Sequence, residues 1–118
     1  MPKTLPVVDV TGPICCSPVG AGAMAEPEAL EVALRLKAIA DPTRVRLLSM
    51  LLAAPDGEAC GCDLAPAVGL TDATVSHHLG QLLKAGLVTR ERRGMNVWYS
   101  PDRSALSALI RVIDPDCC

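Results

Sequence analysis

The chain has 118 residues, of which 50% are hydrophobic and 2% aromatic, and its formal net charge at pH 7 is −2. This length holds one small domain whose core must be built from Leu, Val and Ala, and so small a core favours association with a partner chain. The excess of acidic residues argues against a surface that coats nucleic acid throughout, and no apolar run approaches the ~20 residues that span a bilayer.

Residues 1–26 are predicted to form an extended arm. Four Pro and three Gly residues interrupt this segment and exclude a long helix. In its middle, Pro13 and Pro18 flank the adjacent pair Cys15-Cys16. A broken segment of this kind orders when it binds something. We therefore divide the chain into an arm over residues 1–26, a folded domain over residues 27–114 and a Cys-ending tail over residues 115–118.

Two helices are expected next. Pro27 suits a first helical turn, and apolar residues follow it at spacings of three and four, among them Leu30, Ala33 and Leu34. A second helix starts at Asp41-Pro42, because Asp is a good N-cap and Pro fits the first helical position. Its wide apolar face ends near Pro55 and contains Val45, Leu47, Leu48, Leu51 and Leu52.

The following residues have the spacing of a helix–turn–helix. A short helix is predicted from Asp63, as N-cap, to Val68, and Gly69 ends it. A longer helix then starts at Leu70-Thr71 and ends at Ala85-Gly86. The apolar residues of this second helix recur at helical spacing and are Val75, Leu79, Leu82 and Leu83.

A β-hairpin and a last helix complete the predicted fold. Strands are expected over 87–92 and 96–100, joined by a turn at Arg93-Gly94-Met95. The last helix runs from Asp102 to Ile113, and the residues on its apolar face are Leu106, Leu109, Ile110 and Ile113. Mainly α with a small β-hairpin, this order predicts a winged helix–turn–helix, and we expect it to form homodimers.

The second helix of the motif and the hairpin carry candidate DNA contacts. Short polar side chains that could reach bases or phosphates alternate with its apolar positions, and basic side chains follow on the hairpin. Residues 71–93 contain four basic and two acidic groups, so the overall negative charge conceals a basic edge. The predicted DNA-binding residues are Thr71, Thr74, Ser76, His77, Gln81, Lys84, Arg90, Arg92 and Arg93.

The adjacent histidines His77 and His78 are not predicted to bind a metal. Neighbouring helical residues point ~100° apart, whereas helical metal-binding histidines are usually spaced i, i+4. We expect His77 to face DNA and His78 to lie on the flank of the helix or at the edge of the core.

Six cysteines fall into three tight pairs: Cys15-Cys16, Cys60-Gly-Cys62 and Cys117-Cys118. No export signal is recognisable, so we expect a cytoplasmic, reducing location in which paired thiols favour metal or redox sites over structural disulfides. Buried free cysteine is the alternative for any single residue. The pair Cys60 and Cys62 lies near a helix N-terminus, which stabilises thiolates.

The arm pair and the C-x-C pair together could hold one soft ion. Three thiolates suit a pyramidal metalloid such as As(III), and four suit a tetrahedral ion such as Cd(II), Pb(II) or Zn(II). We therefore predict a metal site at Cys15, Cys16, Cys60 and Cys62. Cys117 and Cys118 form a possible second site, a redox pair or a plain tail.

Three segments carry a family resemblance. LKAIADPTRVRLL at 36–48 resembles the second-helix pattern of the ArsR/SmtB family of metal-responsive repressors, and EACGCDL at 58–64 resembles the metal box of its arsenic and cadmium sensors. TVSHHLGQLLKAGLV at 74–88 is similar to its recognition helix and the start of its wing. The resemblance covers residues 30–100 and implies a cytoplasmic homodimer that leaves its operator when metal binds.

Carried over by position, the resemblance makes Cys60 and Cys62 thiol ligands and likens Cys15 and Cys16 to the arm cysteines of some members. The last helix lacks the family's zinc-site histidines, which argues against a sensor that binds zinc, nickel or cobalt through nitrogen and oxygen. Asp72 stands where the family has a neutral or amide side chain. The terminal cysteines are outside the common pattern.

The sequence thus predicts a homodimeric repressor of double-stranded operator DNA that As(III) or Sb(III) releases. Arsenite is preferred because the arm cysteines are adjacent, which suits a small three-thiolate site; Cd(II), Pb(II) or Zn(II) is the alternative inducer. Another alternative is a repressor whose thiols sense oxidants by forming a disulfide. A thiol enzyme is disfavoured, because the sequence has no C-x-x-C motif or cofactor loop and no organic substrate is implied. The hypothesis of a metal-buffering protein does not explain the helix–turn–helix pattern.

Overall fold

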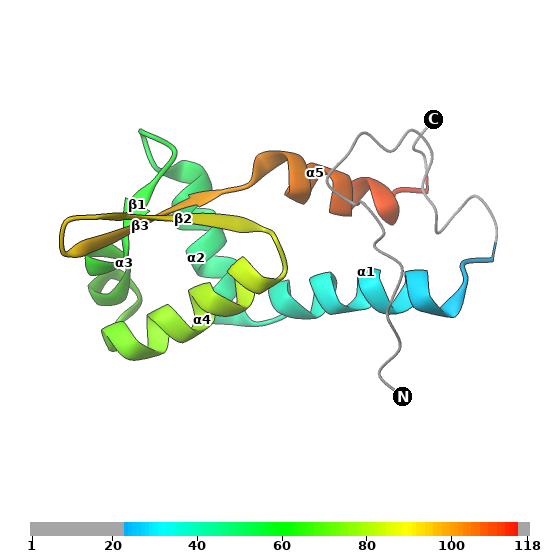
Figure 1. The fold of residues 1–118 in the computed structure, drawn as a ribbon, viewed down its shortest axis with the longest axis horizontal. Helices are drawn as coiled ribbons and strands as arrows, with labels where there is room; N and C mark the ends of the chain where they lie inside the picture. Colours follow the sequence, from blue (N-terminus) through cyan, green and yellow to red (C-terminus); the bar gives the residue numbers. More distant parts are fainter. Residues whose placement is uncertain (1–22, 116–118) are drawn as a thin grey trace. The chain divides into compact units, whose positions relative to one another are not determined.

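The computed structural model describes residues 23–115, so the predicted arm cysteines Cys15 and Cys16 and the tail cysteines Cys117 and Cys118 lie outside the described residues. The chain divides into two compact units, each described by itself: one spans Lys37–Asp102, and the other contains the residues up to Leu36 and those from Arg103 onward. Figure 1 labels the elements, which are α1 (Glu26–Ile39), α2 (Pro42–Ala53), β1 (Ala59–Cys60), α3 (Gly61–Val68), α4 (Asp72–Lys84), β2 (Val88–Arg93), β3 (Asn96–Pro101) and α5 (Arg103–Val112).

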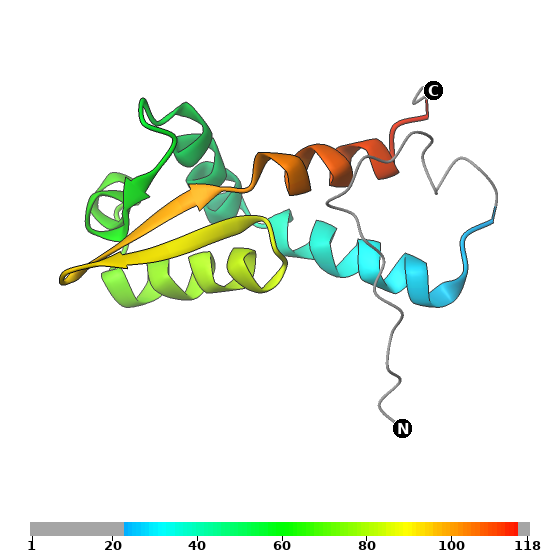
Figure 2. The ribbon, with the colours of Figure 1, turned by 45° about the horizontal axis from the view of Figure 1, so that its top comes forward.

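The unit Lys37–Asp102 has the predicted winged helix–turn–helix fold. Its three strands form an antiparallel sheet in the order β1-β3-β2, and α2 and α3 both contact β3, while α4 contacts β2. Figure 2 shows the hairpin β2–β3 running beside α4. Fully buried side chains fill the space between these elements: Leu47, Leu51, Leu64, Val75, Leu79, Leu82 and Leu87.

Three helix starts in this unit are capped by side chains. Asp41 Oδ2 accepts a hydrogen bond from the backbone N–H of Arg44 at 3.1 Å, and Pro42 occupies the first turn of α2, as predicted. Thr71 Oγ1 caps α4 in the same way. The predicted start of α3 is wrong, because Cys60 rather than Asp63 is its N-cap. Cys60 Sγ accepts from the backbone N–H of Cys62, and the cap lies three residues earlier than predicted.

The wing also differs in detail from its prediction. Arg93 pairs with Asn96 as the last residue of β2, so the turn contains two residues rather than three. Gly94 has φ +62°, a left-handed conformation that glycine adopts without a steric penalty. The strand β1 was not predicted. It pairs with the wing through Ala59 opposite Tyr99 and Cys60 opposite Trp98.

The apolar faces of α1 and α5 are only partly buried. In α5 the buried side chains are Ala105, Ala108, Leu109 and Val112. Leu109 fits the predicted stripe, but Ile110 and Ile113 are 58% and 44% exposed, so their expected burial is wrong for the single chain. Likewise, Val32 is the buried residue of α1 and Leu30 and Leu34 are exposed. Large apolar side chains on these two helices therefore lack cover within residues 23–115.

Val45 and Leu52 of α2 are also exposed, although they belong to the predicted apolar face of that helix. The face is narrower than predicted because Leu47, Leu48 and Leu51 are the residues that contact the core. Within residues 23–115, no helix is both long and apolar enough to cross a membrane.

Candidate functional site

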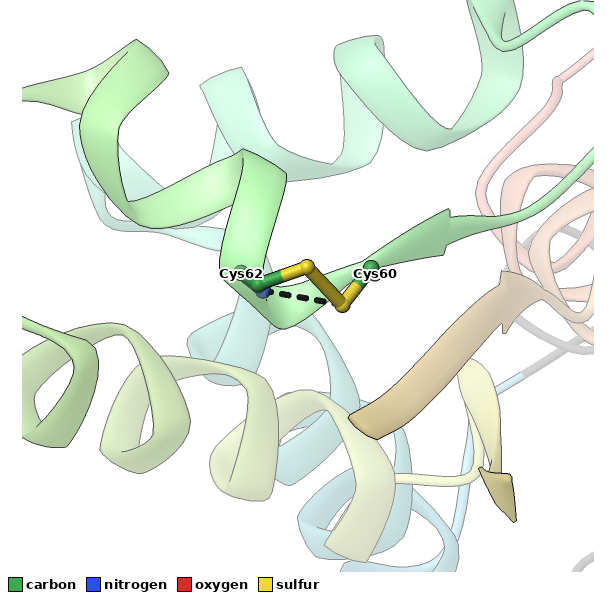
Figure 3. Close-up of a disulfide and its surroundings, with 2 residues drawn as sticks. All are labelled: Cys60 and Cys62. Atoms are coloured by element: carbon green, nitrogen blue, oxygen red, sulfur yellow. Dashed lines mark hydrogen bonds between the residues drawn. A yellow bond between two sulfur atoms is a disulfide. The ribbon is translucent and has the colours of Figure 1, made fainter. Parts of the chain in front are cut away.

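The two cysteines of the C-x-C motif meet at the first turn of α3. Cys60 ends β1 and is 1% exposed, whereas Cys62 is exposed. Their Cα atoms are 5.1 Å apart and their sulfur atoms form a disulfide, as Figure 3 shows. Cys60 Sγ also accepts the 3.1 Å hydrogen bond from the Cys62 N–H, drawn dashed in Figure 3. The prediction that both sulfurs lie at a helix N-terminus is confirmed.

This arrangement fits two ligands of a soft ion once the disulfide is reduced. Reduction adds two electrons and two protons and leaves two thiols, and the N-terminus of α3 favours their thiolate forms. Within residues 23–115, no group of three or more His, Cys, Asp or Glu side chains could hold a metal ion.

A cavity of about 220 Å³ opens beside the sulfur atoms. It is lined by both cysteines and Gly61, by residues near the start of α4, and by residues of the wing: Asp72, Val75, Ser76, Met95, Asn96, Val97 and Tyr99. From the sequence, Asp72 is one of the short polar residues between the apolar positions of α4. In the structure it lines the same cavity as the thiols, so a group bound there is close to both α4 and the wing.

The outer face of α4 is polar and exposed, as a recognition helix requires. Thr71, Thr74, Ser76 and His77 are exposed, Gln81 is partly exposed, and the apolar residues of α4 face the core. The Thr71 hydroxyl donates to Thr74 Oγ1 at 2.9 Å and accepts from the Thr74 N–H at 3.2 Å. These two residues thus begin the helix as well as being candidate DNA contacts.

The two adjacent histidines have different surroundings. His77 is exposed, whereas the His78 side chain is 18% exposed and points toward the start of α2. Arg44 Nη1 donates to His78 Nδ1 at 3.1 Å, and Asp41 Oδ2 lies 3.7 Å from the same nitrogen. Because a guanidinium has only donors, Nδ1 is the acceptor in this contact. His78 therefore lies at the core edge, as predicted, and connects α4 to α2.

The basic residues of the predicted DNA edge are Lys84, Arg90, Arg92 and Arg93, and all four are exposed. Arg92 donates a long hydrogen bond, 3.4 Å, to the Gly94 carbonyl. Arg93 differs, because Nη1 and Nη2 donate to the two carboxylate oxygens of Glu58 at 2.5 and 2.9 Å. Its Nε donates to Glu91, and its guanidinium lies 5.2 Å from the ring centre of Trp98.

These contacts shift the ionisation of both partners. The hydrogen bond from Arg93 lowers the pKa of Glu58, and the hydrogen bonds to Glu58 and Glu91 raise the pKa of Arg93. Sequence reasoning missed Glu58 and Trp98. The one available signal was that Glu58 stands two residues before the C-x-C motif; its partner lies 35 residues further along the chain.

Comparisons with known proteins give a consistent result. The family described as "Bacterial regulatory protein, arsR family" matches residues 41–90, which include α2, α3, α4 and the start of β2. A Halobacterium salinarum relative, ArsR2, whose name refers to an arsenical resistance operon repressor, is 36% identical over 85% of this chain and 81% of its own length. The Staphylococcus aureus protein named as a CadC homolog, a cadmium resistance transcriptional regulatory protein, is 34% identical over 74% of this chain and 70% of its own.

Among solved structures, the chain is similar to the AntR antimony-specific transcriptional repressor. The TM-score is 0.62 at 36% identity, and the match covers 75% of this chain and 79% of that one. The fold is therefore shared with a repressor whose name refers to antimony, while the names of the two sequence relatives refer to arsenic and cadmium.

Proposed function

Because this chain belongs to the ArsR family of bacterial regulatory proteins, we propose that it is a homodimeric repressor that leaves operator DNA when As(III) or Sb(III) binds to its cysteine thiolates. The observation that carries this proposal is the position of Cys60 and Cys62 at the start of α3, in a cavity shared with α4 and the wing. A ligand of these sulfurs lies against the elements that read DNA. A repressor that binds operator DNA acts where that DNA is, so we place the protein in the cytoplasm.

Release follows from linkage between two binding sites. A twofold dimer places its two recognition helices about one helical turn of DNA, ~34 Å, apart. If ion binding favours a different arrangement of the two subunits, the ion weakens DNA binding by the same factor by which DNA weakens ion binding. The free energy of this coupling is typically about 1–3 kcal/mol. The exposed apolar residues of α1 and α5 support dimerisation: Leu30, Leu34, Ile110 and Ile113.

The ion needs more sulfur ligands than the two described. We propose that the arm, residues 1–26, brings Cys15 and Cys16 to Cys60 and Cys62, while residues 27–114 bind DNA and dimerise. The tail, residues 115–118, supplies Cys117 and Cys118 as a possible second site. A three-thiolate set suits As(III) and Sb(III), which the names of ArsR2 and AntR support. The cadmium-resistance relative supports the alternative, a four-thiolate site for Cd(II), Pb(II) or Zn(II).

We further propose that DNA is bound by the polar face of α4 and by basic side chains after it. We assign the exposed and partly exposed polar residues of α4 as contacts to bases and phosphates. The arginines and the lysine are assigned as contacts to phosphates. The assigned residues are Thr71, Thr74, Ser76, His77, Gln81, Lys84, Arg90 and Arg92. Arg93, which the sequence also predicts to contact DNA, has its guanidinium paired with Glu58 and Glu91.

The test is a displacement titration. The reduced protein is bound to a labelled operator duplex, and arsenite, antimonite, Cd(II), Pb(II) and Zn(II) are added in turn while fluorescence anisotropy is recorded. The titration is repeated with each cysteine pair changed to Ser. We expect arsenite or antimonite to act at the lowest concentration and to require the pair Cys60 and Cys62. Release by none of these ions would overturn the proposal.

A second candidate function follows from the disulfide itself. Cys60 and Cys62 lie close enough to form a disulfide, so a peroxide can oxidise their two thiols. The thiols give up two electrons and two protons, and hydrogen peroxide, for example, is reduced to two molecules of water. In that case operator release tracks oxidation and needs no ion. Peroxide added to the same protein–operator complex, followed by dithiothreitol, distinguishes this function from ion sensing.

A further inference from the structure

The strand that carries Cys60 belongs to the same sheet as the wing. Cys60 lies opposite Trp98 on β3, and Trp98 lies opposite Glu91 on β2. Figure 1 shows β1 beside the hairpin, with α3 directly following it. The thiol pair and the wing are therefore connected inside one subunit, without passing through a dimer interface.

A side-chain contact reinforces this connection at the edge of the sheet. Glu58 immediately precedes β1, and Arg93 is the last residue of β2 before the wing turn. The two carboxylate oxygens and the two terminal guanidinium nitrogens form a paired, bidentate contact, the strongest geometry for this pair of groups. Arg93 also lies over Trp98, so it contacts β3 as well as the residue that precedes β1.

We propose that Glu58 and Arg93 form a clamp that transmits the state of the Cys60–Cys62 pair to the wing of the same subunit. Arg93 is then a positioning residue of the wing, whereas its neighbour Arg92 remains a phosphate contact. This inference rests on the proposed function, because it names the route by which a change at the thiols alters DNA binding. The clamp is defined as the bidentate contact between Glu58 and Arg93.

Sulfur geometry gives the physical reason for movement. The sulfurs of a disulfide lie about 2.05 Å apart. Two thiolates that bind one ion at about 2.3 Å each lie about 3.3 Å apart around a pyramidal ion and about 3.8 Å apart around a tetrahedral one. Cys62 is exposed and Cys60 is 1% exposed among core residues. Because the packed Cys60 side chain has little room to turn, part of the displacement must pass to the backbone of residues 58–62.

The clamp connects the displaced backbone of residues 58–62 to the wing. The strand β1 has two residues and pairs with β3 only through them, so by itself it holds the wing weakly. The Glu58 side chain fastens the residue before β1 to the tip of β2. A shift of residues 58–62 then pulls on Arg93 and through it on the turn that contains Gly94 and Met95.

The test uses the full chain and backbone amide NMR shifts, with the emission of Trp98 as a second signal, since this is the only Trp in the sequence. Spectra are compared for three states: the oxidised protein, the protein reduced by dithiothreitol, and the reduced protein with arsenite. In the reduction, dithiothreitol gives up two electrons and two protons and forms its cyclic disulfide. The variants are Glu58→Gln and, as matched control, Glu91→Gln. The control removes the other carboxylate that binds Arg93 but leaves β1 connected to the wing.

We expect the amides of Gly94 and Met95 to shift between these states in the wild-type protein and in Glu91→Gln. In Glu58→Gln these wing shifts are lost, while Trp98, which pairs directly with Cys60, still responds. Wing shifts of wild-type size in Glu58→Gln, or an unmoved wing in the wild-type protein, would overturn the clamp. If Glu58→Gln does not fold, Arg93→Lys takes its place, because it keeps the charge but loses the bidentate geometry.

Two further arms complete the design. In the double variant Glu58→Arg with Arg93→Glu the two charges are exchanged and the pair can form again, so the wing shifts should return. They would not return if Glu58→Gln had abolished them by damaging the fold. The variant Cys62→Ser measures any response that comes from the other cysteines. No arm uses DNA and the oxidation arm uses no ion, so the clamp can fail while arsenite still releases the operator. Conversely, operator release can be absent while the wing still follows the thiols.

Discussion

The starts of α2 and α3 are both capped by a side chain, but Asp41 accepts from the N–H three residues on and Cys60 from the N–H two residues on. Each helix is preceded by an extended residue, Asp41 or Cys60, whose side chain accepts a backbone N–H at 3.1 Å. At α2 the acceptor is a carboxylate oxygen. At α3 it is Cys60 Sγ, which is bonded to Cys62 Sγ in a disulfide. Of these two caps, the sulfur is the one whose covalent state can change by reduction or oxidation.

Each start also supports a different DNA-reading element. The residues at the beginning of α2 contact the recognition helix through Arg44 and His78. The residues at the beginning of α3 contact the wing through the pairing of β1 and through Glu58. The helix α4 is therefore joined to the helix start that the Asp41 carboxylate caps, and the wing to the helix start that the Cys60 sulfur caps.

The largest expected effect comes from removing the chemistry at α3. In Cys62→Ser the exposed sulfur is lost, and the cap sulfur of Cys60 remains. Operator affinity in the absence of ion should stay near the wild-type value, while the ion-dependent weakening, expected to be about 5–150-fold, disappears. Anisotropy titrations of the operator with and without arsenite measure both quantities. A normal response would place the ion site at other cysteines, Cys117 and Cys118 included.

The matching change at α2 should affect stability alone. Asp41→Ala removes the cap and also the carboxylate near His78, so the free energy of unfolding should fall by about 1 kcal/mol. The ratio of operator affinities with and without arsenite should not change. Urea unfolding measures the first quantity and the operator titration the second. Asp41→Asn keeps the cap and serves as control; a changed ratio in Asp41→Ala would show that the α2 start is part of the switch.

Much of the fold follows from local sequence signals. Asp41-Pro42 begins α2, and Gly86, with φ +75°, follows the end of α4, because these residue types satisfy helix ends in a local way. The position of the thiols at a helix N-terminus follows from the same reasoning. The helix–turn–helix and the hairpin were predictable because each element is long enough to show its own periodicity.

Contacts between distant segments could not be predicted in this way. The strand β1 has only two residues, too few for an alternating pattern, and it exists because β3 pairs with it. The Glu58–Arg93 contact joins residues 35 positions apart, and charge alone does not select it from the other possible pairs. On α5, small Ala side chains are buried and the larger Ile110 is not, because packing rather than hydrophobicity decides which stripe faces inward.

A smaller effect should separate the two arginines of the wing. Arg92→Ala removes one phosphate contact, so operator affinity should weaken with or without ion, and the salt dependence of binding should fall by about one unit of slope. The wing's response to the thiols should be retained, because the Glu58–Arg93 contact is intact in this variant. Operator titrations at several salt concentrations provide the measurement. An unchanged affinity and slope would mean that Arg92 does not contact DNA.

The smallest effect concerns the ionisation of Glu58. Arg93 lowers the pKa of this carboxyl from its ordinary value near 4.5, so in Arg93→Met the pKa should rise toward that value. A lowered folded-state pKa contributes stability that is fully present above the ordinary value and is lost as pH falls through the lowered one. At neutral pH the wild-type protein therefore has this contribution and Arg93→Met lacks it. Carboxyl ¹³C shifts followed by NMR give the pKa, and Arg92→Met is the matched control. If Arg93→Met leaves the pKa of Glu58 unchanged, the Glu58 and Arg93 side chains are not paired in solution.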